Sequence, residues 1–230
     1  MPQPARRLGA LAPAVPGRLV AVLLLLGSLL MTVSVPIDPP PTGEEPRGTI
    51  EAYAAEPERM DIAATLLHNG FLLFGLGLLL LGLIAPRGRG RTLALVGGIA
   101  ACIGFADLSG TVLVDWMDSA AARITSVETA VQISEAAPLP WLLAGWLVPQ
   151  TVASFLGPLL LLAGLARAGV TSWWLLAVPV VGTGVLLLVP GPLGVGLGFG
   201  ANVVLAGLLA RPLWAARTTS SERVTEPSRV

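Results

Sequence analysis

Two ionisable side chains, His68 and Asp107, lie within apolar stretches of the 230-residue chain. An ionisable group in an apolar membrane segment is costly to bury and usually faces a partner or an internal cavity. Counted from Asp61 and Asp115 at the ends of these stretches, His68 lies roughly 10 Å and Asp107 roughly 12 Å below the same surface. A short turn links the two stretches, which are therefore expected to be antiparallel helices in which the two side chains could meet.

Two interpretations of this pair are open. His68 and Asp107 could form a hydrogen-bonded or ionic clamp that fixes two helices to each other. Alternatively, they could relay a proton through a small cavity, as in transporters and some membrane enzymes. A carrier would need a cavity that is open to one face and lined by these residues.

Other polar side chains in the apolar stretches extend the pair into a candidate binding cluster, which we define as His68, Asp107, Thr111, Gln150 and Asn202. If the protein is an enzyme, Asp107 and His68 are the catalytic candidates, and Asp115 and Asp118 could assist Asp107 as a general acid. Small residues recur beside the cluster and would allow close helix contact in lipid. They are Gly75 and Gly82 on the side of His68, Gly97, Ala100 and Gly104 on the side of Asp107, and Ala153, Gly157 and Gly164 on the side of Gln150.

Sequence signatures of cofactor chemistry are absent from the chain. It has no Walker loop, HExxH, CxxC or G-x-S-x-G motif, and only one histidine and one cysteine, Cys102. Zinc or haem sites built on pairs of histidines are therefore not expected, and the sequence predicts no metal and no cofactor. The formal net charge of zero gives no indication of a nucleic-acid partner.

Composition predicts the fold class. Hydrophobic residues make up 54% of the chain and charged residues only 12%, about half the charged fraction of soluble domains. Six apolar runs of near-spanning length show helical periodicity. The prediction is an all-α integral membrane bundle over 19–215, with six spans at about 19–36, 62–85, 92–114, 141–166, 172–190 and 193–210.

The distribution of arginine predicts the orientation. Eleven of the 14 basic residues, all of them arginine, flank one side of the spans, and only Arg47, Arg59 and Arg123 flank the other. By the positive-inside rule, the segment 1–18 and the C-terminus are cytoplasmic. The polar tail 216–230 is expected to be disordered.

The two outer loops are predicted to contain short helices. Glu56-Pro57-Glu58 is typical of a helix start, because proline and acidic residues favour the first turn. A short surface helix is therefore expected to lead into the second span. In the loop 115–140, the alanine-rich segment 119–131 is expected to be a helix along the membrane surface.

The span pattern, the run His68-Asn69-Gly70, the arginine-rich turn 87–91 and the segment Gly110–Asp115 resemble uncharacterised six-span bacterial inner-membrane proteins, which are classed as domains of unknown function. This resemblance implies a multi-pass protein of the bacterial plasma membrane. The leading hypothesis is a non-enzymatic accessory or interaction component, with the lipid bilayer and a membrane-protein partner or second copy as its contacts. The alternatives are a proton-coupled small-molecule carrier that uses His68 and Asp107, and a membrane-embedded enzyme in which Asp107 is a general acid acting on a lipid-soluble substrate.

Overall fold

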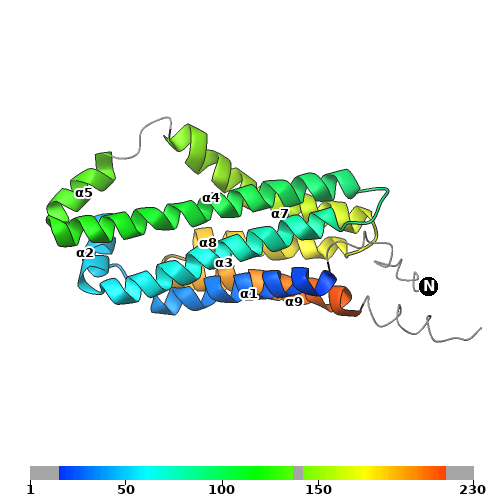
Figure 1. Cartoon of the computed structure of the whole chain (residues 1–230), viewed down its shortest axis with the longest axis horizontal. Coiled ribbons are helices and arrows are strands. Elements are labelled where there is room, and N and C mark those ends of the chain that lie inside the picture. Colours follow the sequence, from blue (N-terminus) through cyan, green and yellow to red (C-terminus); the bar gives the residue numbers. More distant parts are fainter. Residues whose placement is uncertain (1–15, 137–141, 216–230) are drawn as a thin grey trace, which may run out of the picture.

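The computed structural model describes residues 16–136 and 142–215, and the regular structure within these ranges is helical. Most of the predicted N-terminal segment and the tail 216–230 lie outside the described residues. Figure 1 shows the long helices side by side along the longest axis of the molecule. In chain order the elements are α1 (Gly17–Ile37), α2 (Arg47–Ala55), α3 (Pro57–Leu83), α4 (Arg91–Ile124), α5 (Val127–Ala136), η2 (Leu143–Leu147), α7 (Val148–Arg167), η3 (Trp173–Leu176), α8 (Ala177–Leu188) and α9 (Gly191–Ala215).

Within residues 16–136 and 142–215, five helices are long and apolar enough to cross a membrane, as judged by length and composition. They are Gly17–Ile37, Pro57–Leu83, Arg91–Ile124, Ala144–Arg167 and Gly191–Trp214. The remaining predicted span, 172–190, corresponds to a shorter apolar stretch, Trp173–Leu188. This stretch combines 4 residues of 3-10 helix with 12 residues of α-helix, which gives a length of roughly 25 Å.

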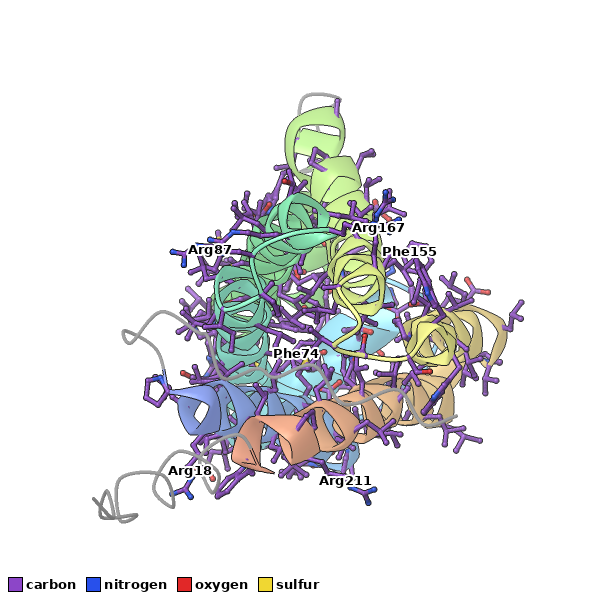
Figure 2. All side chains as sticks on the ribbon, turned by 90° about the vertical axis from the view of Figure 1, so that its right-hand side faces the viewer. Arg18, Phe74, Arg87, Phe155, Arg167 and Arg211 are labelled. Carbon is purple, nitrogen blue, oxygen red and sulfur yellow. The ribbon has the colours of Figure 1, made fainter. Side chains whose placement is uncertain are left out.

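The helix α4 is central to the packing. It contacts α3 and α7, while α1 packs against α3 and α9, and α8 packs mainly on α9. Figure 2 views the bundle along its axis, with Phe74 between the helices. The Phe74 side chain is 1% exposed, and its ring meets that of Phe105 on α4 edge-on at 5.0 Å between centroids.

Glycines allow α4 to approach both neighbours closely. A Cβ added at Gly97 would overlap the backbone of Leu161, and one added at Gly157 would overlap the backbone of Ala101. On the α3 side, a Cβ at Gly82 would lie 2.7 Å from the carbonyl oxygen of Ala94. The small residues expected to mediate close helix contact therefore lie at the helix interfaces.

The helix start predicted at Glu56-Pro57-Glu58 is confirmed, because α3 begins at Pro57 and has Glu58 in its first turn. This helix is the second span itself, however, and the separate short helix of the loop is α2. In the second loop, α4 continues beyond the predicted end of the span at Val114 to Ile124. The predicted surface helix 119–131 is therefore divided between α4 and α5.

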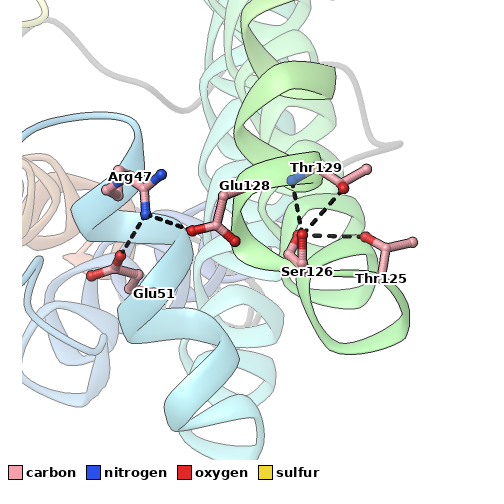
Figure 3. Close-up of polar contacts among 6 residues, drawn as sticks. All are labelled: Arg47, Glu51, Thr125, Ser126, Glu128 and Thr129. Carbon is pink, nitrogen blue, oxygen red and sulfur yellow. Dashed lines mark hydrogen bonds and ion pairs between the residues drawn. The ribbon is translucent and has the colours of Figure 1, made fainter.

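Local polar contacts explain the break between α4 and α5. The hydroxyl of Thr125 donates a hydrogen bond of 2.7 Å to the carbonyl of Ala121, at the last turn of α4. The hydroxyl of Ser126 accepts a hydrogen bond of 3.2 Å from the backbone N–H of Thr129, as a helix N-cap does (Figure 3). These contacts end one helix and start the next.

A cap at one end of the bundle is formed by α2, α5 and the last turns of α4. Ile50, Ala122 and Ala130 form its small apolar core. On its surface, the Arg47 guanidinium donates hydrogen bonds of 3.2 Å to Glu51 and 3.1 Å to Glu128, so the ion pair joins α2 to α5 (Figure 3). Because these charged groups are exposed, the apolar contacts contribute more to the stability of the cap than the ion pairs do.

The close packing of α4 on α7 leads to a prediction for glycine variants. Gly97→Ala should lower the melting temperature of the purified protein, because the added methyl group displaces the α7 backbone at a cost of roughly 1–3 kcal/mol. Gly200→Ala in α9 is the matched control, since nothing lies within 4 Å of its added Cβ. Equal melting temperatures for the two variants would contradict the close contact.

Candidate functional site

The structure gives His68 a partner other than the predicted one. Its Nδ1 lies 2.7 Å from the hydroxyl oxygen of Ser109 on α4, and the donor depends on the imidazole tautomer. The ring also lies 6.1 Å from that of Trp116 between centroids. His68 therefore helps to join α3 to α4, which is the clamp interpretation with Ser109 in place of Asp107.

Asp107 is not brought to His68. No hydrogen bond or ion pair between these two residues occurs in the described part of the chain, so the predicted contact is not formed. The reason is helical geometry, since Asp107 precedes Ser109 by two residues and residues two apart point in nearly opposite directions. The short turn correctly predicts neighbouring helices, but depth alone does not determine which face a side chain occupies.

The other members of the candidate binding cluster are dispersed. The Thr111 hydroxyl donates to the carbonyl of Leu108 in its own helix at 2.6 Å. Gln150 is buried, and its Oε1 atom lacks a hydrogen-bond partner among the described residues. It lies on α7, which packs against α4. Asn202 lies on α9, which packs against α1 and α8, so the structure does not gather the cluster around one point.

A cavity of about 290 Å³ lies at the end of the bundle where α2 is found. Its walls come from the end of α1, the segment that follows it, α2, α3, α4 and the start of α9. Of the four residues that the sequence predicts as catalytic candidates, only Asp115 lines it. The polar side chains of the lining are Ser34, Asp38, Glu45, Thr49, Tyr53 and Asp115.

The cavity is polar near the surface and apolar deeper in the bundle. Pro40, Pro41 and Glu45 are exposed and form its outer rim. From the first turns of α3 and α9 the lining continues inward to Leu67 and Phe199. Phe199 lies eight positions after Gly191, which corresponds to roughly 12 Å along α9. The ring of Phe199 is held edge-on against that of Phe71 on α3, with 5.9 Å between centroids.

Asp115 is the most strongly perturbed acid of the cavity. It follows Val114, where the apolar run of α4 ends, and so lies beyond the predicted span. Burial raises the pKa of its carboxyl group to about 7, and the negative charges of Asp38, Asp118 and Glu45 act in the same direction. Removal from water disfavours the charged form of an acid, and nearby like charges add to that cost.

Asp38 and Tyr53 are perturbed by the same environment. Burial raises the pKa of Asp38, while the nearby Tyr53 hydroxyl and the charge of Arg59 oppose that shift. Burial also raises the pKa of Tyr53, which therefore keeps its proton and remains a donor, and the charges of Asp115 and Asp38 contribute. The cap holds the backbone of this tyrosine, because the Ser119 hydroxyl donates a hydrogen bond of 3.3 Å to the backbone carbonyl of Tyr53.

Arg59 is the basic residue beside Asp38, but most of its hydrogen bonds are to backbone carbonyls. Its Nε atom donates to the carbonyl of Ile37 at 2.6 Å, and one terminal nitrogen donates to the backbone carbonyls of Pro36 at 3.3 Å and Asp38 at 3.4 Å. These carbonyls belong to the end of α1, where cationic groups stabilise the helix dipole. Its other terminal nitrogen donates to the carboxylate of Glu56 at 3.0 Å. None of the described lining residues is basic.

The second acid of this region, Asp118, is hydrogen-bonded within the cap. The Ser134 hydroxyl on α5 donates a hydrogen bond of 3.2 Å to its Oδ2 atom. Burial raises the pKa of Asp118, and this hydrogen bond opposes the shift. The sequence therefore indicates two acids at the outer end of α4, but only Asp115 faces the cavity.

Sequence reasoning missed three of the cavity's polar residues, Asp38, Glu45 and Tyr53. They belong to a loop and a short helix that contain many acids, and most acids in such loops are solvated. One feature of the sequence could have indicated this site: Tyr53 is the single tyrosine of the chain and lies close in sequence to several acids.

No family model matches the chain. No curated protein matches it. No solved structure matches it.

Proposed function

We propose that the protein crosses the plasma membrane of a bacterium six times, with α8 as the short span and both termini in the cytoplasm. The charges at the two ends of the bundle support this orientation. Arg18, Arg87, Arg167 and Arg211 lie towards the end that faces the viewer in Figure 2. The acidic cavity lies at the opposite end. This arrangement is in keeping with the resemblance to six-span proteins of the bacterial inner membrane.

Tryptophan marks the arginine-rich end of the bundle as a membrane–water interface. The side chains of Trp173 and Trp174, in the segment that follows α7, are more than half exposed. Trp214 near the end of α9 is also exposed, and the Arg18 guanidinium lies 5.5 Å from its ring centroid. Tryptophan and arginine side chains of this kind anchor helices at the membrane–water interface.

The topology can be tested by labelling introduced cysteines. In a Cys102→Ser background, Gln3→Cys and Ser221→Cys should both react with an impermeant maleimide in inverted vesicles and not in intact spheroplasts. Gly43→Cys, in the loop after α1, should give the opposite pattern and serves as the control. Labelling of the C-terminal cysteine from outside, with the N-terminal one inside, would contradict six spans, since an odd number of crossings separates the termini.

We further propose that the protein works without enzymatic chemistry, as a membrane component that binds a small ligand at its outer end. The observation that carries this proposal is the cavity itself, which combines partly buried carboxyl groups with an apolar inner wall. Ligand sites are commonly concave and mostly apolar, with a few polar groups that fix the orientation of the ligand. At about 290 Å³ the cavity is suited to a small ligand.

The cavity favours ligand binding over the two alternatives suggested by the sequence. A carrier centred on His68 and Asp107 would need a cavity lined by both residues. The lining includes Leu67, which precedes His68 in α3, but neither His68 nor Asp107. An enzyme would need Asp107 at a pocket, and the acid found there is Asp115. Its partners are Asp38, Glu45 and Tyr53, which can hold a ligand but form no nucleophile–base pair.

A cavity-filling variant tests the proposed binding. In a thermal-shift screen of small cations, anions and neutral amphiphiles, at least one class should raise the melting temperature of the wild type. Val195→Trp, on the cavity wall, should abolish that shift. Leu197→Trp should preserve it, because Leu197 lies on the same helix and is 54% exposed. If no class stabilises the protein, or if Val195→Trp responds like the wild type, the proposal is wrong.

A further inference from the structure

The chemical class of the ligand follows from the charge of the cavity, and this step rests on the proposed function. Three carboxyl groups, those of Asp38, Glu45 and Asp115, line one small volume. Arg59 directs its donors to the backbone carbonyls of Ile37, Pro36 and Asp38 and to the carboxylate of Glu56. The described lining thus has several acids and no base of its own. Because a partly buried carboxylate is costly without a counter-charge, the cavity is complementary to a cation.

The spread of the acids favours an organic cation over a metal ion. Hard metal ions require several oxygen ligands that converge at about 2.0–2.6 Å. In the part of the chain that the structure describes, no group of three or more histidine, cysteine, aspartate or glutamate side chains is placed to hold a metal ion. The carboxyl groups instead surround a volume large enough for several non-hydrogen atoms.

The apolar inner wall indicates the chemistry of the uncharged part of the ligand. Leu67, Val195 and Phe199 form apolar surface below the acids. Tyr53 adds an aromatic ring near Asp38 and Asp115, and aromatic rings attract ammonium groups through their electron-rich faces. A ligand with a positive head and a short apolar body would place each part against a complementary wall.

We infer that the cavity binds an organic monocation, with its ammonium group between Asp38, Asp115 and Tyr53 and its apolar body against Leu67, Val195 and Phe199. Glu45 at the outer rim attracts the cation during entry. The site is distinct from the contact between His68 and Ser109, which lies at the interface of α3 and α4.

The test uses the purified full-length protein in an uncharged detergent and hexyltrimethylammonium as the probe, with hexanesulfonate as the anion of similar size. Isothermal titration with a detergent-only blank should show binding of the cation and none of the anion. Asp115→Asn should weaken cation binding at least tenfold, and Asp38→Asn provides a second variant should the first fail to fold. Asp61→Asn is the matched control, because Asp61 is an exposed acid at the same end of the bundle that does not line the cavity.

Binding should also depend on pH in a defined direction. Because the pKa of Asp115 is raised to about 7, protonation below that pH removes its negative charge, and the affinity should rise between pH 5.5 and 8. Asp38, Glu45 and the phenol of Tyr53 line the same cavity, Asp118 lies near Asp115 without lining it, and Arg59 is the nearby base. Asp115→Asn should flatten this rise.

Two failures can be told apart. Equal binding of the cation and the anion, unchanged by Asp115→Asn and lost in Val195→Trp, would overturn the inferred charge of the ligand and leave the binding cavity intact. Binding of neither probe overturns the inferred ligand class. Absence of any response in the thermal-shift screen as well would overturn the proposed function.

Discussion

The close contact of α4 with α3 and α7 is the constraint on which the rest of the structure depends. At Gly97 and Gly157 there is no space for a side chain, so the register between α4 and α7 is fixed by backbone contact. On the α3 side, Gly82 has the same role. This register places Ser109 beside His68. The same helix then continues beyond its apolar run and places Asp115 in the wall of the cavity.

Charge is distributed unevenly along the bundle. Arginines at one end can meet water and anionic headgroups, and they need no further partner there. At the other end, the cap and the start of α9 enclose acids together with apolar side chains. Burial therefore acts on Asp115 and Asp38 more strongly than the available hydrogen bonds do. This imbalance distinguishes the cavity from an ordinary acidic loop.

Much of the fold could be predicted from the sequence, because long apolar runs have few stable alternatives to helices. The positions of five long apolar helices follow directly from these runs. Hydropathy could not predict where α4 ends, because the residues from Asp115 to Ile124 are polar enough to resemble a loop. These residues are helical because they pack on α2 and α5. The break at Thr125 and Ser126 depends on local hydroxyl contacts that hydropathy does not register.

The candidate site was predicted less well, for a physical reason. Ionisable residues in an apolar run attract attention because they are costly, and His68 does take a polar partner. The partner is Ser109, since the helical phase places Asp107 on another face of α4. Asp38, Glu45 and Tyr53 approach Asp115 only through the folding of the cap and the arrangement of six chain segments. Asp115 could be identified as a candidate, whereas its surroundings depend on tertiary packing.

The central claim is that Asp115 occupies a partly buried, acidic cavity without a neutralising base. Infrared difference spectroscopy of the purified protein tests it most directly, with Asp115→Asn to identify the carboxyl band. We expect a protonated carboxyl signal that disappears as the pH rises through about 7 and that is missing in Asp115→Asn. An Asp115 that is already ionised at pH 5 would show a solvated or neutralised carboxylate and would contradict this account of the cavity.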